Sequence, residues 1–183
     1  MWASGIKGSN WFVAIGGFRV AGVGDPRVLV RALGEAISPQ LAQIVDAGRV
    51  AGRDHLYMAA VNATRSTETG LAVSKSITVE AMLYASTQDQ ITKALTRMGV
   101  KAGTRRIALM VFAHSQMEAE EAYKKAAKLL GTEDDSILEV DTEKAEALRE
   151  AYCIGDEEIK AAGGPFALCG LIVERGSLLS LRR

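Results

Sequence analysis

Runs of apolar residues along the chain predict a small set of β-strands. The run 107–113 is almost continuously apolar, which is typical of a strand buried on both faces of a sheet. Residues 11–20 and 41–45 predict two further strands, and 137–140 a short edge strand. Residues 81–85 form another apolar run, which also indicates a strand. The sequence therefore predicts a sheet of four or five strands.

Helices are predicted where apolar residues recur three and four positions apart. The clearest case follows the run 81–85, where Ile91, Ala94, Leu95 and Met98 lie on one helical face. Asp25-Pro26 is a typical helix start, and Gly131 is a typical helix end. The predicted helices are 26–37, 50–65, 91–98, 116–130, 142–152, 156–162 and a last helix beginning at Pro165. Residues 66–76 are polar and are expected to form an irregular or partly helical loop.

The last predicted helix is apolar on most of its circumference. It carries Phe166, Leu168, Leu171, Ile172 and Val173, and apolar residues continue through Leu178, Leu179 and Leu181. A helix of this kind is buried, either in the core of its own domain or against a partner. Two apolar faces on a chain-terminal helix favour a partner-binding role, with plain core packing as the alternative.

Length and composition place the chain among single-domain globular proteins. It has 183 residues, of which 48% are hydrophobic and 24% charged, and no apolar run approaches the roughly 18 residues that span a bilayer. The glycine-broken N-terminus lacks the features of a secretory signal. Cys153 and Cys169 are too few and too far apart for a disulfide framework or a zinc site. We expect one cytoplasmic domain over residues 1–183, without a membrane partner, and 1–10 is a candidate disordered segment.

Charge is unevenly distributed although the net charge is zero. Residues 90–114 contain no acidic residue and five basic ones, namely Lys93, Arg97, Lys101, Arg105 and Arg106. A cluster of this density is a candidate phosphate-binding surface. The alternative is a solvated helix end, since the helix dipole favours cations such as Arg97 and Lys101 near a C-terminus.

The sequence offers little support for catalysis. His55 and His114 fall on different predicted elements, and His114 ends the central strand, where ligands bind in open sheets. Phosphate-binding, nucleophile-elbow and zinc-protease motifs are not present in the sequence. Acidic pairs such as Asp134-Asp135 lie in polar surface sequence. We expect no enzyme activity, metal or cofactor; the competing hypothesis is a small enzyme with a pocket near His114.

Several segments together resemble a known family. They are HLYMAAVNATRS, VEAMLYASTQDQITKALTRMGV, IALMVFA and DEEIKAAGGPFALCGLIVERGSLLSL. In these segments the chain resembles the kinase-binding subunit of the KEOPS (EKC) complex, over roughly residue 27 to the C-terminus. The resemblance implies a non-catalytic accessory subunit that docks on the atypical protein kinase of that complex through its C-terminal helix, and that meets the other subunits only indirectly.

The resemblance also implies tRNA binding. The subunit would recruit tRNA by its 3′ acceptor end for threonylcarbamoyladenosine modification beside the anticodon. The kinase-binding residues would be Phe166, Leu168, Leu171, Ile172 and Leu178, and the tRNA-binding residues would be Arg65, Lys75, Arg97, Lys101, Arg105 and Arg106. Single-stranded nucleotides usually also stack on planar side chains, for which Tyr57, Tyr84 and His55 are candidates. A kinase-binding scaffold without RNA binding is a further alternative.

The predicted fold class is α+β, with a central sheet flanked by helices and with C-terminal helices. The alternation of strands and helices would suit parallel strands, whereas the resemblance implies a mixed or mainly antiparallel sheet. The sequence therefore leaves the strand directions open.

Overall fold

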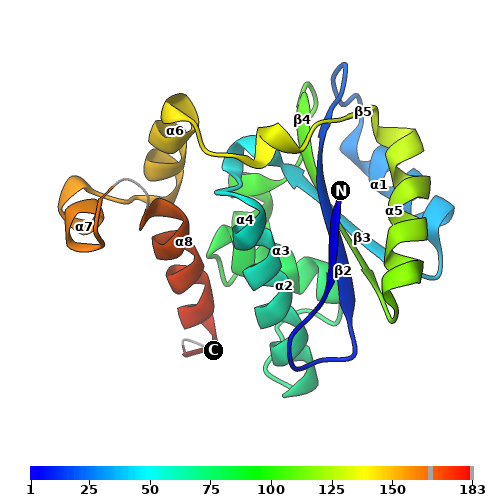
Figure 1. Ribbon diagram of the computed structural model, residues 1–183, viewed down its shortest axis with the longest axis horizontal. Coiled ribbons are helices and arrows are strands. Elements are labelled where there is room, and N and C mark those ends of the chain that lie inside the picture. The colour runs from blue at the N-terminus through cyan, green and yellow to red at the C-terminus, as the bar shows by residue number, and fades with distance from the viewer. Residues whose placement is uncertain (165–166, 182–183) are drawn as a thin grey trace.

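An antiparallel β-sheet forms the centre of the protein in a computed structural model that describes residues 1–164 and 167–181 (Figure 1). Its strands are β1 (Trp2–Gly5), β2 (Phe12–Arg19), β3 (Leu41–Asp46), β4 (Arg106–Ala113) and β5 (Thr132–Glu133). The order is β1-β2-β4-β3, with β5 pairing with the end of β2, and every pairing is antiparallel. The predicted α+β class is confirmed, and the open question of strand direction is settled.

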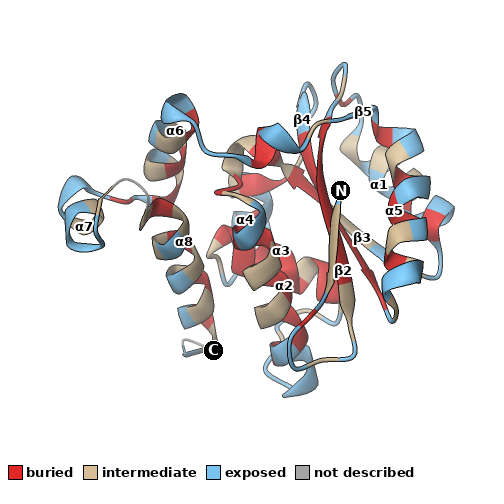
Figure 2. Cartoon of the chain, viewed as in Figure 1, coloured by how far each residue is buried: buried red, intermediate tan, exposed pale blue. Residues whose placement is uncertain are grey.

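Helices cover both faces of the sheet (Figure 1). One face packs against α1 (Pro26–Ile37) and α5 (Gln116–Leu130), and the other against α2 (Arg53–Glu68), α3 (Ile77–Ser86) and α4 (Ile91–Met98). The central strands β2 and β4 pair along their whole length, and their residues are almost all buried (Figure 2). Alternate residues of each strand therefore supply two separate apolar cores.

Short polar side chains fix where these helices begin. The Asp25 side chain accepts a hydrogen bond from the backbone N–H of Arg27 at 2.8 Å, and Pro26 occupies the first helical position, as predicted. Ser115 caps α5 in the same way through the N–H of Glu118. On β2, a Cβ at Gly16 would lie only 1.8 Å from the Tyr123 hydroxyl, so glycine is required for α5 to pack this close.

A third group of helices lies beside α2, α3 and α4, away from the sheet (Figure 1). It consists of α6 (Thr142–Tyr152), α7 (Asp156–Ala161) and α8 (Leu168–Ser177), followed by the 3₁₀ helix η4 (Leu178–Leu181). We call these elements the C-terminal arm. Leu148, Tyr152 and Ile172 are the centre of its own small apolar cluster. None of the helices within the described residues is long and apolar enough to cross a membrane.

Buried Lys144 connects the arm to the segment that precedes it. Its ammonium group donates to the carbonyls of Ile137, Leu138 and Glu139 at 2.7, 3.0 and 3.1 Å, at the end of the 3₁₀ helix η2 (Asp135–Leu138). Burial lowers the pKa of Lys144 to about 8. These three bonds compensate the cost of burying a charge and fix the start of α6.

The structure corrects the prediction of a strand at 81–85. These residues lie in helix α3, in which all residues but Val79 are buried. A helix that is buried on every side has no polar face, so its apolar run cannot be distinguished from that of a buried strand. The Glu80 side chain faces inward, where it accepts hydrogen bonds from the Ser66 hydroxyl at 3.3 Å and the Ser74 backbone N–H at 3.1 Å.

Two smaller predictions also differ from the structure. Residues 137–140 were expected to form an edge strand, but 137–138 belong to η2, and the short strand at this end of the sheet is β5. Asp134 favours the helical turn because its side chain accepts from the Ser136 N–H. Residues 1–10, a candidate disordered segment, include β1, which pairs with β2 and places Trp2 opposite Ile15.

Candidate functional site

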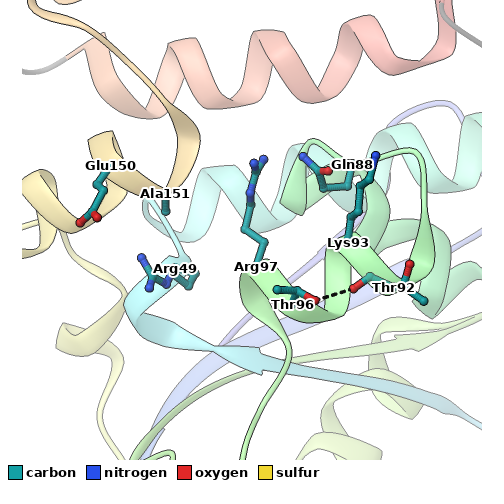
Figure 3. A pocket seen from close by; sticks show the side chains of 8 residues that line it. All are labelled: Arg49, Gln88, Thr92, Lys93, Thr96, Arg97, Glu150 and Ala151. Atoms are coloured by element: carbon teal, nitrogen blue, oxygen red, sulfur yellow. Dashed lines mark hydrogen bonds between the residues drawn. The ribbon is translucent and has the colours of Figure 1, made fainter.

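A cleft of about 520 Å³ opens between the body of the protein and the C-terminal arm (Figure 3). Its walls come from α4, from the short 3₁₀ helix η1 (Ala47–Arg49) and from α6. The lining residues are Arg49, Gln88, Thr92, Lys93, Thr96, Arg97, Glu150 and Ala151. The lining therefore carries three cations and one carboxylate, which gives the cleft a net positive charge suited to an anionic ligand.

Arg97 is held in place at the centre of this cleft. One of its guanidinium nitrogens, Nη1, donates to the Ser86 carbonyl and to the Thr87 hydroxyl, both at 2.8 Å. The guanidinium also lies 5.3 Å from the centroid of the Tyr152 ring. Nε and Nη2 make no hydrogen bond within the described residues and are available to a ligand. A fixed arginine with free donors is preorganised for binding phosphate.

Lys93 and Arg49 complete the positive wall. Lys93 lies one turn before Arg97 on α4 and points the same way in Figure 3. It is exposed and makes no ion pair within the described part of the chain. Arg49 donates to the Ala147 carbonyl at 3.1 Å. Lys93 belongs to the basic cluster seen in the sequence but was not among the predicted tRNA-binding residues, and Arg49 lies outside that cluster altogether.

Two of the remaining predicted tRNA-binding residues lie next to elements that form this cleft. Lys101 donates to the carbonyl of Thr96, a lining residue, at 3.1 Å. Arg106 begins β4 beside η1, because a Cβ on Gly48 would lie 3.6 Å from its Nη2.

Arg105, Arg65 and Lys75 are exposed but do not line the cleft; Arg65 lies on α2 and Lys75 in the loop after it. Of the six predicted cations, the structure brings Arg97, Lys101 and Arg106 together around α4 and η1.

Two of the three candidate stacking residues are enclosed by the protein. His55 and Tyr84 are 1% and 3% exposed, so neither can stack on a nucleotide. His55 accepts the N–H of Ala51 at 3.0 Å through Nδ1, and its Nε2 lies 2.8 Å from the Ala85 carbonyl. Burial lowers the pKa of His55 to about 4. Tyr57 is half-buried, and its hydroxyl donates to the Gly5 carbonyl.

The structure divides the predicted kinase-binding residues of α8 into two groups. Leu168 and Ile172 are buried in the arm's own cluster, so these two cannot be docking contacts while the arm is folded. Leu171 is half-buried, and Leu178 in η4 is 40% exposed. Phe166 lies outside the described residues. The inward face of α8 packs closely against α3 at Gly176, because a Cβ there would lie only 2.6 Å from the Tyr84 carbonyl oxygen.

His114, the centre of the competing enzyme hypothesis, lies on the surface at the end of β4. Its ring packs against Trp11 at an interplanar angle of 40° with a centroid separation of 4.1 Å, and Nδ1 lies 3.4 Å from the Asn10 carbonyl. It does not line the cleft described above. Within residues 1–164 and 167–181, no three His, Cys, Asp or Glu side chains gather closely enough to hold a metal ion.

Comparison with known proteins gives a family for this fold and cleft. The sequence model described as "Kinase binding protein CGI-121" matches residues 24–173. The chain belongs to the CGI-121 kinase-binding family. A similar curated protein is the regulatory protein Cgi121 of Methanocaldococcus jannaschii, 33% identical over 113 residues that cover 61% of this chain and 70% of that protein. The resemblance predicted from the sequence is confirmed.

The region that matches the CGI-121 family includes the whole lining of the cleft. It contains all eight residues that line the cleft, and it extends into α8 as far as Val173. Leu178 and Leu181, the most exposed leucines of the arm, lie beyond it. The cleft therefore lies within the matched region, whereas Leu178 and Leu181 lie outside it.

Proposed function

We propose that this chain is a non-catalytic subunit of a KEOPS-type complex that binds the complex's atypical protein kinase and recruits tRNA by its 3′ acceptor end. An adenosine beside the anticodon of that tRNA would then be modified to threonylcarbamoyladenosine. One observation carries the proposal: in a chain of a kinase-binding family, Arg49, Lys93 and Arg97 line one cleft. A cleft of this charge suits phosphates of a single-stranded nucleotide tail.

The geometry supports nucleic acid over a small metabolite. Further exposed cations lie near the cleft, since Lys101 donates to the carbonyl of the lining residue Thr96 and Arg106 lies beside η1. Several cations on neighbouring elements suit a chain of phosphates, since each phosphate that is neutralised releases condensed counterions. The fixed guanidinium of Arg97 would position one phosphate, and the exposed ammonium of Lys93 would neutralise a neighbouring one.

The RNA part of the proposal is tested by salt-dependent binding. The assay measures the affinity of the full chain for intact tRNA and for tRNA trimmed of its 3′ tail, over a range of salt concentrations. We expect trimming to weaken binding. In the double variant Lys93→Ala/Arg97→Gln, the slope of log K against log salt should fall by about 1.4, since each lost single-strand phosphate contact contributes about 0.7.

A matched control removes two exposed lysines from the opposite side of the sheet. Lys124→Ala/Lys125→Ala on α5 changes the net charge equally but leaves the cleft intact. An equal loss of slope in both double variants, or equal affinity for trimmed and intact tRNA, would contradict a role of the cleft in binding the 3′ end. The kinase-binding scaffold without RNA would then be the better hypothesis.

The kinase-binding part of the proposal places the contact at the outward end of the arm, where Leu171, Leu178 and Leu181 remain at least partly exposed. Leu178→Asp/Leu181→Asp should abolish co-elution with the kinase subunit in gel filtration, with the thermal unfolding of the isolated chain unchanged. Leu129→Asp is the control, because Leu129 is 46% exposed but lies on α5. If all variants bind the kinase equally, the contact lies elsewhere.

A further inference from the structure

Strand β3 leaves one edge of the sheet without a partner strand. It pairs with β4 along Leu41–Asp46, and within the described residues no other strand pairs with it. A groove of about 460 Å³ crosses this edge between α1, on one face of the sheet, and α4, on the other. Its floor is formed by Gln43 and Ile44 of β3, and its apolar walls include Val30, Leu95 and Val100.

The groove is apolar in its walls and positive at its rim. Val30 is 53% exposed and Leu95 48%, so both side chains present unused apolar surface. Arg27 and Arg31 lie one helical turn apart on α1, are exposed, and make no side-chain hydrogen bond or ion pair with any described residue. No aspartate or glutamate lines the groove. Its charge therefore complements an acidic ligand.

One backbone carbonyl of the edge strand also accepts a hydrogen bond from a side chain of the same strand. The Gln43 side-chain amide donates to the Ile44 carbonyl at 2.9 Å, in addition to the pairing of β3 with β4. The N–H of an added strand would make a bond of the same kind. Unpaired strand edges are the usual sites of strand addition, and an added strand directs alternate side chains to opposite faces of the sheet.

From these observations we propose that the edge of β3 docks an extended, acidic segment of a partner protein, which adds to the sheet as a further strand. Its side chains would alternate between the α1 side, near Val30, and the α4 side, near Leu95, and its carboxylates would pair with Arg27 and Arg31. A second copy of this chain fits less well, because pairing two β3 edges would bring both pairs of arginines together. RNA would leave the apolar walls unused.

The proposal is tested with a labelled peptide in which glutamate alternates with valine, and with its counterpart in which lysine replaces glutamate. Fluorescence anisotropy with the full chain should detect binding of the acidic peptide only. Val30→Asp should weaken that binding by at least about tenfold, because it places a carboxylate beside the glutamates that Arg27 and Arg31 would bind. Val28→Asp is the matched control, since Val28 is 51% exposed on the same helix but does not line the groove.

Two further measurements separate the possible occupants. Arg27→Glu/Arg31→Glu should reverse the preference to the basic peptide, and hydrogen exchange of β3 amides should slow when the acidic peptide binds. Failure of the acidic peptide to bind, equal effects of Val28→Asp and Val30→Asp, or slowed exchange only outside β3 would overturn the proposal. Dimerisation that Val30→Asp abolishes, or tRNA binding that it weakens tenfold, would assign the groove to a second copy or to RNA instead.

Discussion

The buried imidazole of His55 makes the stability of this fold sensitive to mild acid. His55 is 1% exposed and lies between two segments of the body, bonded to Ala51 on one side and Ala85 on the other. Nδ1 accepts an N–H, so this nitrogen has no room for a proton without losing the bond to Ala51. Burial lowers the pKa of His55 to about 4, compared with 6.5 for an exposed histidine.

The sign and size of the effect follow from the two pKa values. Because the folded state has the lower pKa, the unfolded chain binds more protons between pH 6.5 and pH 4. The contribution of neutral His55 to the free energy of unfolding is therefore fully present above about pH 7, and it is lost as the pH falls from 6.5 to about 4. The total is about 3 kcal/mol, of which about 2 kcal/mol is already lost at pH 5.

Urea unfolding at a series of pH values, for the wild type and for His55→Gln, measures this contribution. Glutamine can keep a donor and an acceptor in the same place but does not titrate. We expect His55→Gln to be less stable at pH 7 but to lose about 2 kcal/mol less than the wild type between pH 7 and pH 5. Parallel pH profiles for the two proteins would refute the reasoning, whatever their absolute stabilities, since the carboxylates contribute equally to both.

Two further predictions concern the attachment of the arm. Gly176→Ala should destabilise the protein by about 1–3 kcal/mol in urea unfolding, because its Cβ would contact the Tyr84 carbonyl, whereas Gly170→Ala on open surface of the same helix should be neutral or stabilising by up to about 1 kcal/mol. Equal effects would show that α8 is not tightly packed there. Tyr152→Phe removes a hydroxyl that donates to two backbone carbonyls and should cost about 1–3 kcal/mol by thermal unfolding; Tyr57→Phe, whose bond is exposed, should cost less.

Local signals in the sequence located most of the elements of this fold. Asp25-Pro26 marks the start of α1, and Gly131 the end of α5, because capping depends on residues that are adjacent in the chain. The same local signals gave a wrong prediction for α3. This helix is buried on all sides, so its apolar residues do not recur with a helical period. Strand direction also depends on contacts between distant segments, which a single sequence does not reveal.

The candidate site could be predicted only in part, for the same reason. Lys93 and Arg97 lie one turn apart on a predicted helix, so their shared face is visible in the sequence. Arg49 lies more than forty residues earlier in a short 3₁₀ turn, and only the folded chain brings it to the cleft. The apolar pattern of α8 identified Leu168 and Ile172 as buried residues, but it could not distinguish their own core from a partner's surface.

The cleft has one wall on the body and another on α6, and this division has a thermodynamic consequence. An RNA that contacts both walls of the cleft would bind best to one orientation of the arm. A kinase bound to the outward side of α8 would also favour one orientation. The two ligands would then raise or lower each other's affinity by the same factor, as linkage requires. The arm would thus couple RNA binding to kinase binding without any contact between the two ligands.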